Sequence, residues 1–447
     1  MPDNPIPERY RTDFLFLLIG TNPLPNFVAA TLLARDNSTI YLLHSNSADA
    51  PSTQQFATFL QAILKKHRPQ LTIIPRGISE ADGQMIPGQM RTILNDAAIP
   101  SDSQVGLNYT GGTKPMAVHT YRALVAGDRP YNVSFSYLDA RKLALYFDDS
   151  GMAYGVANHV ALSLEDLAGL HGYELLPKQS QPLPLELAQA LRKVHQTKNG
   201  IQQWRRWLNP DLLDLPEEQV LAAMRTAYQE RKLYADVQKM LNETMALLHN
   251  RLPEREQFPQ LGPVIDVFAT MCEGVPEATK VAQMMGVEKL SSLSKWFWGG
   301  WLEDIVLQAI QQNQERFAIQ ESGLAAGVMV KPGAVLLSSI KTQPKPKDFE
   351  LDVIVLVGYQ LFVISCIARD KADGETKNHL FQAYVRARQL GGDEARVGLV
   401  CLADNPQAVQ NELEREWQTA GSLRVFGRSD LADLAGSLRQ WFAPVKG

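Results

Sequence analysis

The chain has few of the features that mark exported or membrane proteins. Only three of its 447 residues are cysteine, Cys272, Cys366 and Cys401, and they lie far apart. Three scattered thiols form neither a disulfide framework nor a metal–thiolate site, and they indicate a reducing cytoplasm. The longest uninterrupted apolar run, residues 14–19, is too short to span a bilayer. The first residues carry no signal-peptide pattern, so we expect a cytoplasmic protein.

Neither sign of charge dominates the chain. Its 44 Lys and Arg residues against 48 Asp and Glu residues give a net charge of −4. This balance disfavours a general nucleic-acid coat protein but leaves room for a local basic groove. With 45% apolar and 21% charged residues over 447 positions, the chain is typical of a soluble protein of two or three domains. We divide it into residues 1–157, 158–290 and 291–447.

The first domain alternates between apolar strand-like runs and amphipathic helical stretches. This alternation predicts a Rossmann-like α/β domain whose parallel sheet binds its ligand beyond the carboxyl ends of the strands. Three polar loops, 20–26, 45–47 and 110–114, are expected at that edge, and they predict a ligand crevice there. The strands are expected at 14–19, 39–44, 71–74 and 104–108, the helices at 27–33, 52–66, 84–97 and after 114, and a hairpin at 134–138 and 142–147.

The most informative segment is residues 106–116, Gly-Leu-Asn-Tyr-Thr-Gly-Gly-Thr-Lys-Pro-Met. Its two glycines allow close backbone approach, Thr110 and Thr113 offer hydroxyls, and Lys114 places a cation where a helix begins. A helix N-terminus already favours an anion, so the segment suits phosphate binding. The alternative is a tight turn with Thr113 as helix N-cap. The Walker spacing is absent, and the absence of G-x-G-x-x-G disfavours a dinucleotide enzyme.

The middle region, 158–290, contains no convincing strand. A short helix over 162–172 is closed by Gly172, 182–184 resembles a linker, and apolar residues recur at helical spacing over 216–250. One cluster combines basic and aromatic side chains. It predicts either a nucleic-acid contact or a helix that is half core and half solvated. Its members are His195, Trp204, Arg205, Arg206 and Trp207.

The C-terminal region contains three acids in a suggestive arrangement. On a helix from 296 to about 314, Glu303 lies at the edge of the apolar face, whereas Asp304 falls on the polar side. An acid at such an edge needs a partner or a metal, unless it tips into solvent. Strands at 350–357 and 360–366 follow, and Glu350 and Asp352 share one strand face. Helices at 376–390 and 405–418, a strand at 396–402 and a last strand–helix pair complete an α/β domain.

A helical glutamate, an acid near the start of a hairpin and an acid-x-Lys on the next strand form the PD-(D/E)xK nuclease layout, whose carboxylates hold Mg²⁺ or Mn²⁺. Here the third element is Ser365-Cys366-Ile367, in which Ser365 is at most a weak ligand and Ile367 has no acid–base chemistry. Either the nuclease is weakened or other groups replace the missing ones. The sequence-level candidates are Lys371, Glu375, Lys377 and Glu394.

Several of these segments resemble one family. The string from Asn108 to Met116 resembles the signature of CARF domains, the sensors of cyclic oligoadenylate in type III CRISPR immunity. Residues 299–303 and 350–353 resemble motifs of the branch that carries a restriction-endonuclease-like domain, and 391–396 sits where that branch has a Gly-Gly turn. The resemblance covers roughly residues 10–175 and 290–405 and leaves the helical middle unmatched.

The resemblance implies a homodimeric antiviral effector. A CARF domain would bind a cyclic oligoadenylate, with cyclic tetra-adenylate suiting a two-fold dimer, and would activate a Mn²⁺- or Mg²⁺-dependent nuclease that cuts DNA or RNA. Two alternatives stay open: a ligand-gated adaptor with a degenerate nuclease domain, and cleavage of the ring in the sensor itself, with Thr113 and Lys114 at the attacked phosphate.

The expected site residues follow from these segments. The catalytic set is Glu303, Glu350, Asp352 and Ser365, with Glu303 and Asp352 as metal ligands. The ligand-binding set is Thr21, Asn22, Pro23, Asn26, Ser45, Asn108, Thr110, Gly111, Gly112, Thr113 and Lys114.

Overall fold

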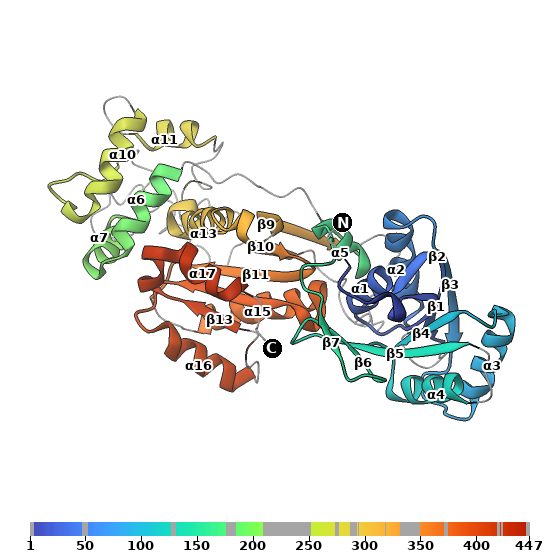
Figure 1. The fold of residues 1–447 in the computed structure, drawn as a ribbon. Helices are drawn as coiled ribbons and strands as arrows, with labels where there is room; N and C mark the ends of the chain where they lie inside the picture. Colours follow the sequence, from blue (N-terminus) through green and yellow to red (C-terminus); the bar gives the residue numbers. More distant parts are fainter. Residues whose placement is uncertain are drawn as a thin grey trace, which may run out of the picture.

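The computed structural model contains two sheets, each flanked by helices, in an elongated molecule with further helices at one end (Figure 1). The predicted mixed α/β class, with helices between two α/β regions, is confirmed. No helix in the described part of the chain is long and apolar enough to cross a membrane. The structure describes residues 4–46, 52–126, 131–175, 185–208, 252–272, 277–286, 293, 295–317, 319–330, 349–370, 374–417, 421 and 423–443.

The N-terminal sheet has the order β3-β2-β1-β4-β5-β6-β7. Pairing is parallel from β3 through β5 and antiparallel from β5 to β7. The expected hairpin is confirmed as β5 and β6, whereas β7 was not foreseen. Because β1 lies between β2 and β4, the loops that follow β1 and β4 part to opposite faces, which makes a topological switch point. The strands are β1 (Thr12–Leu18), β2 (Ala34–Ser45), β3 (Thr72–Ile78), β4 (Gln104–Asn108), β5 (Asn132–Asp139), β6 (Ala144–Phe147) and β7 (Ala153–Gly155).

Helices cover both faces of this sheet. Along β1, Leu15 and Leu17 enter one buried cluster and Phe16 and Leu18 enter another, as expected for a strand covered on both sides. The first cluster includes side chains of α1, α2 and α5, and the second includes side chains of α3 and α4. The helices are α1 (Leu24–Leu33), α2 (Gln54–His67), α3 (Met85–Ala97), α4 (Lys114–Val125) and α5 (Leu164–Leu170).

The C-terminal sheet has the order β13-β12-β11-β10-β9-β8. The hairpin β10–β11 is as predicted, and β11, β12 and β13 are parallel. Strands β8 and β9 were missed, and the expectation that 158–290 holds no strand is wrong at β8, which is too short to show a period of two. The strands are β8 (Tyr173–Leu175), β9 (Ile319–Val330), β10 (Phe349–Val357), β11 (Gln360–Ile367), β12 (Arg396–Cys401) and β13 (Leu423–Phe426).

Helices of the C-terminal region flank this sheet, and a π-helical turn, η4 (Trp296–Gly300), leads directly into α13. The α-helices are α13 (Trp301–Gln311), α14 (Gln314–Phe317), α15 (Gly374–Gly391), α16 (Pro406–Trp417) and α17 (Leu434–Phe442). The 3₁₀ turns among the described residues are η1 (Glu8–Tyr10), η3 (Pro259–Leu261), η5 (Gly392–Glu394) and η6 (Arg428–Asp433).

The middle helices share a buried cluster with the C-terminal sheet. They are α6 (Leu185–His195), α7 (Lys198–Leu208), α10 (Gly262–Cys272) and α11 (Ala278–Met284). Trp204 is buried and donates its Nε1–H to the carbonyl oxygen of Phe297 at 3.3 Å, while Arg205 pairs with Asp370 at 3.1 Å. The basic-aromatic cluster is therefore half core and half solvated face. The segments expected at 182–184 and 216–250 lie outside the described residues.

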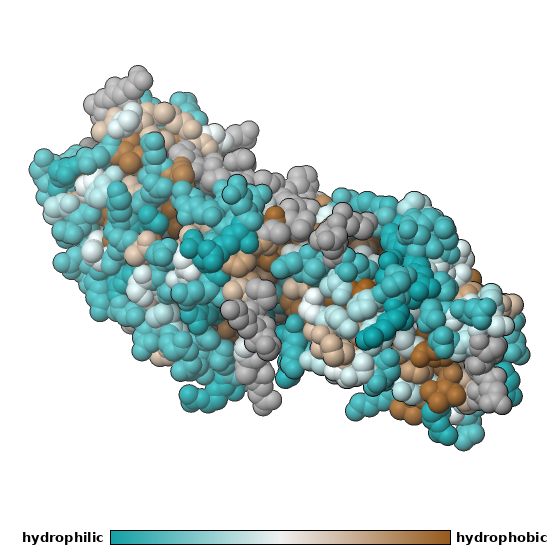
Figure 2. Space-filling model, viewed as in Figure 1, coloured by the Kyte–Doolittle hydropathy of each residue, from teal (hydrophilic) through white to brown (hydrophobic). Residues whose placement is uncertain are grey.

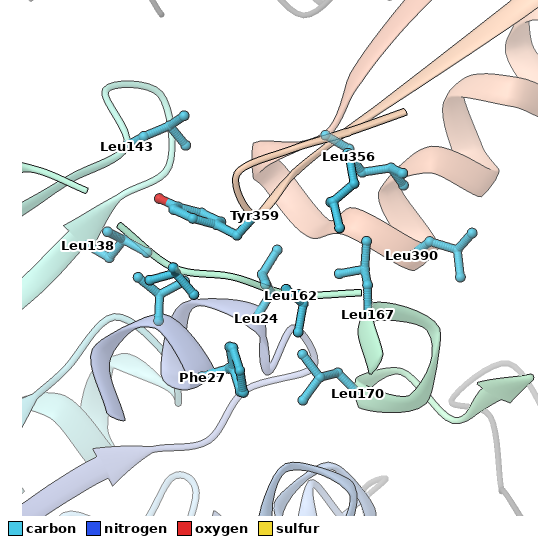
Figure 3. Close-up of a cluster of buried hydrophobic side chains, with 14 of the residues drawn as sticks. Leu24, Phe27, Leu138, Leu143, Leu162, Leu167, Leu170, Leu356, Tyr359 and Leu390 are labelled. Carbon is cyan, nitrogen blue, oxygen red and sulfur yellow. The ribbon is translucent and has the colours of Figure 1, made fainter. Parts of the chain in front are cut away.

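An apolar interface joins the two α/β domains. The end of the β10–β11 hairpin carries Leu356 and Tyr359, which face helices of the N-terminal domain (Figure 3). The facing side chains are Leu24 and Phe27 of α1 and Leu167 of α5. At the turn of this hairpin Gly358 has φ +60°, and a Cβ there would lie 1.9 Å from the carbonyl oxygen of Ala157. The turn thus packs backbone to backbone against the N-terminal domain.

Replacing Gly358 tests this contact. Gly358→Ala should lower the free energy of unfolding by about 1–2 kcal/mol for the left-handed φ and by about 1–3 kcal/mol more for the clash. Gly151→Ala is the matched control, because Gly151 has φ +62° but nothing within 4 Å of its Cβ position. Urea unfolding of both variants measures the difference, and equal losses would show that the turn does not press on Ala157.

Candidate ligand cavity and carboxylate site

A cavity of about 750 Å³ opens where β1 and β4 end, at the switch point of the N-terminal sheet. Loops that follow three neighbouring strands form most of its wall, and Asp393 and Glu394 of the C-terminal domain complete it. This volume lies in the upper part of the range of small-molecule binding pockets. The lining residues are Ile19, Gly20, Thr21, Asn22, Pro25, Ser45, Thr53, Glu80, Thr110, Gly111, Gly112, Thr113, Met116, Leu138, Ala140, Asp393 and Glu394.

The Gly-Gly turn brings two strands' loops into backbone contact. A Cβ on Gly111 would lie 2.2 Å from the carbonyl oxygen of Leu18, and Gly112 has φ +73°. A Cβ on Gly20 would lie 3.3 Å from the amide nitrogen of Gly112. The cavity floor is therefore main chain, and only glycine fits at Gly111.

Polar side chains fix the shape of this turn. The buried Asn108 accepts from the N–H and the hydroxyl of Thr110 at 3.3 and 2.8 Å and donates to Ser136 Oγ at 3.1 Å. Thr110 Oγ1 also accepts the N–H of Leu138 at 2.7 Å. Thr113 Oγ1 accepts the N–H of Met116 at 3.3 Å and donates to the carbonyl oxygen of Glu80. Thr113 is thus the N-cap of α4, and it lines the cavity as well.

The structure brings most, but not all, of the expected ligand residues to the cavity wall. Asn26 is buried and donates to the carbonyl oxygen of Leu18 at 3.0 Å, and Asn108 lies behind the turn. Pro23 is the buried N-cap residue of α1, and Lys114 is exposed at the start of α4. Those in the wall are Thr21, Asn22, Ser45, Thr110, Gly111, Gly112 and Thr113.

Thr53 also lies in this wall, although it was not among the expected ligand residues. Thr53 Oγ1 accepts the N–H of Ser45 and Thr53 N–H donates to Ser45 Oγ, both at 2.9 Å, and the Thr53 hydroxyl donates to the carbonyl oxygen of Ile19 at 3.0 Å. This pairing ties the loops after β1 and β2 together. The Ser-Thr pair just before α2 is a helix-start signal that could have found it.

Glu394 is the main correction. It was a sequence-level candidate for the carboxylate site, but the structure places it in the cavity wall, where Asn22 Nδ2–H donates to its Oε2 at 3.1 Å. Burial raises the pKa of Glu394 to about 7. Lys377, another candidate, instead pairs with Glu412 and Glu416 on α16. Lys371 and the side chain of Glu375 lie outside the described residues.

The second site lies in the C-terminal domain, where α13 meets β10. Ser365 Oγ–H and Cys366 N–H donate to Asp352 Oδ2 at 3.1 and 2.9 Å. Burial, and after it the charge of Asp352, raise the pKa of Glu303 well above its usual value. Glu350 is exposed at the edge and adds to this effect. Asp352 and Glu350 are thus close enough for their charges to act on Glu303.

The expectation for Asp304 is wrong. Helical geometry placed it on the polar side of its helix, but it is only 2% exposed, and Trp296 Nε1–H donates to its Oδ2 at 2.6 Å. Trp296 belongs to the π-helical turn η4, which an ideal helical wheel does not anticipate.

These residues fit a metal ion only in part. Carboxylate oxygens are the ligands that Mg²⁺ and Mn²⁺ prefer, and two close carboxylates with no cation between them repel each other. In the parts of the chain that are described, however, no group of three His, Cys, Asp or Glu side chains converges on one point. Ser365 contributes a hydroxyl that already bonds to Asp352, and Ile367 contributes no polar group.

Comparisons with known proteins identify the fold. No protein-family model matches the chain, and no curated protein sequence does. The solved structure of protein VC1899 from Vibrio cholerae matches with TM-score 0.60 and 16% identity over 96% of this chain and 97% of that one. Can2 from Sulfobacillus thermosulfidooxidans, solved with cyclic tetra-adenylate, matches with TM-score 0.58 and 15% identity over 96% and 99%. The fold expected from the resemblance is confirmed across nearly the whole chain.

The carboxylate pair predicts a pH-dependent stability. The pKa of Glu303 is higher in the folded state than in the unfolded state. Its contribution to the free energy of unfolding is therefore fully present below the unfolded-state pKa and is lost as pH rises through the folded-state pKa. Glu303→Gln should therefore raise the free energy of unfolding near neutral pH, with the gain vanishing near pH 4.

Urea unfolding at both pH values measures this gain. The exposed Glu315→Gln is the control and should change stability by less than about 0.5 kcal/mol at either pH. A gain for Glu303→Gln that is equal at both pH values would contradict the raised pKa.

Proposed function

We propose that the protein is a CARF-type effector in which cyclic oligoadenylate, bound in the N-terminal cavity, controls a metal-dependent nuclease in the C-terminal domain. The cavity carries this proposal, because it lies at the switch point and is floored by the main chain of the Gly-Gly turn. The helix that follows adds the positive end of its dipole, which favours a phosphodiester. Can2, which has this fold, was solved with cyclic tetra-adenylate and supports the choice of ligand.

An exposed apolar patch supports a dimer of this domain. Three apolar side chains are more than half exposed: Met85 of α3 (54%), and Val118 (53%) and Val125 (58%) of α4. The brown patch at the lower right of Figure 2 lies over α4. Patches of this kind mark interaction sites. A two-fold contact through α4 would bring the N-termini of two α4 helices to one ring, which matches the symmetry of cyclic tetra-adenylate.

A short structural path links the cavity to the carboxylate site. The turn of the β10–β11 hairpin presses on Ala157, and its strands carry Asp352 and Ser365. Gln360, the first residue of β11, donates its Nε2–H to the main-chain carbonyl oxygen of Glu394 in the cavity wall at 2.7 Å. A ligand that binds one arrangement of these contacts better than another would shift the hairpin, and with it Asp352.

Glu303 and Asp352 would hold the metal ion of the nuclease. When bound, Mn²⁺ or Mg²⁺ supplies Lewis-acid stabilisation and an activated water for phosphodiester cleavage. Ser365 and Cys366 hold Asp352 in place through its Oδ2 atom. Because Ser365 and Ile367 replace the acid and the lysine of the second-strand motif, we expect weak metal binding and a preference for Mn²⁺.

A second candidate function is a ligand-gated adaptor. The presence of Ser365 and Ile367 where the nuclease layout has Glu and Lys favours it. In that case the C-terminal domain would bind a partner in response to the ligand. Cleavage of the ring inside the cavity has less support, because the Thr113 hydroxyl is already bonded and Lys114 lies outside the lining.

The ligand assignment predicts the effect of Gly111→Ala. Its Cβ would lie 2.2 Å from a carbonyl oxygen, so the floor must shift at a cost of about 1–3 kcal/mol, which corresponds to a loss of about 5- to 150-fold in affinity. Calorimetry with cyclic tetra-adenylate measures this loss and should give one ring per two chains. Gly88→Ala, with open space around its Cβ position, is the control. Unchanged affinity of a folded Gly111→Ala protein would refute the site.

The nuclease assignment predicts a split between binding and cleavage. Asp352→Ala should lower ligand-dependent cleavage of DNA or RNA with Mn²⁺ by about 100-fold or more, since metal stabilisation supplies several kcal/mol. Binding of cyclic tetra-adenylate should not change, because the cavity is elsewhere.

The double change Ser365→Glu with Ile367→Lys restores the nuclease layout and serves as the matched gain-of-function variant. It should preserve or raise cleavage. If the parent protein cleaves no nucleic acid with ligand and Mn²⁺ present, the adaptor function replaces the nuclease.

A further inference from the structure

We propose that Glu394, a residue of the C-terminal domain, is a proton-linked ligand residue of the N-terminal cavity. An anionic ligand binds with this carboxyl protonated, so ligand affinity falls as pH rises. The inference rests on the proposed function in one respect: the ligand is a phosphodiester such as cyclic oligoadenylate, which carries one negative charge per phosphate.

Glu394 reaches the cavity through a close contact between the two domains. It ends the turn η5, which joins α15 to β12, and Asn22 Nδ2–H donates to its Oε2 at 3.1 Å. The turn approaches Asn22 so closely that a Cβ on Gly392, which has φ +64°, would lie 1.8 Å from Asn22 Nδ2. Asn22 and Glu394 both line the cavity, so a ligand there meets both domains at once.

The carboxyl group of Glu394 is held in an environment that does not suit a charge. The residue is only 1% exposed, and Oε1 has no hydrogen-bond partner in the described part of the chain. Burial raises its pKa to about 7, while hydrogen bonds from the backbone N–H of Glu394 and from Asn22, followed by the charge of Arg388, oppose this effect. Arg388 is instead paired with Asp393.

Most of the other titratable groups around Glu394 are acids. Glu80 and Asp393 also line the cavity, and Asp393 is paired with Arg388. The hydroxyl of Tyr359 is buried without a hydrogen-bond partner among the described residues, and burial followed by the charge of Glu394 raises the pKa of this phenol. A phosphodiester entering the cavity therefore meets further acids, and Glu394 has only the charge of Arg388 to offset its own when it is ionised.

Protonation removes this repulsion. Because Oε2 accepts the N–H of Asn22, the proton belongs on Oε1, which is itself buried. Below about pH 6 the carboxyl is protonated with or without ligand, so affinity does not depend on pH there. Above about pH 7 each pH unit should weaken binding by about tenfold per carboxyl, until the pKa of the bound state is reached.

Calorimetry with cyclic tetra-adenylate at about pH 6, 7 and 8, in buffers of different ionisation enthalpy, tests the inference by measuring affinity and protons taken up. The full-length parent should take up protons on binding at pH 7–8 and bind less tightly at pH 8. Glu394→Gln, which keeps a donor and an acceptor without a charge, should bind without proton uptake and with equal affinity at all three pH values. Glu80→Gln changes another acid of the cavity wall in the same way and should retain the pH dependence.

The outcomes separate the inference from the proposed function. Parent protein that binds the ring with pH-independent affinity and no proton uptake would overturn the role of Glu394 and leave the ligand assignment standing. Proton uptake that persists in Glu394→Gln would also overturn it. Absence of binding at every pH would reject the ligand itself.

Discussion

The contact between the two α/β domains is the constraint on which the rest of the structure depends. Tyr359 and Leu356 at the end of the β10–β11 hairpin are buried against α1 and α5, so one apolar cluster runs through both domains. Separating the domains would expose this surface, at a cost of about 25 cal/mol per Å² of apolar area. Movement of the hairpin is therefore coupled to the packing against the N-terminal domain, and so is the position of Asp352.

The same constraint makes the cavity a property of both domains. The loops after β1 and β4 form its floor, but Asp393 and Glu394 close one side, and Asn22 bonds directly to Glu394. A ligand in this position contacts the two bodies whose relative arrangement it would control. No separate transmission element is required, because the wall of the cavity is already joined to β11 through Gln360.

Local patterns in the sequence predicted most of the elements and the turn, but not β7, β8, β9 or the contacts across domains. Phe14 to Ile19 reads as a buried strand, and Thr113 as an N-cap, because both signals lie within a few residues. The approach of Glu394 to Asn22 joins positions 372 residues apart, and no periodicity carries that information. Glu394 was accordingly expected at the carboxylate site, which is nearer to it in the sequence. Asp304 was expected on the polar side of its helix, but Trp296 of the π-helical turn before α13 bonds to it.

We expect a ligand in the N-terminal cavity to act on the C-terminal hairpin through this shared wall. Hydrogen–deuterium exchange of the full-length protein, with and without cyclic tetra-adenylate, measures this coupling. Exchange should change in the turn over 391–396 and in the hairpin from 353 to 366, as well as in the cavity loops. Changes confined to the loops at 19–23 and 109–114 would contradict this coupling, because the ligand would then bind without reaching the second domain.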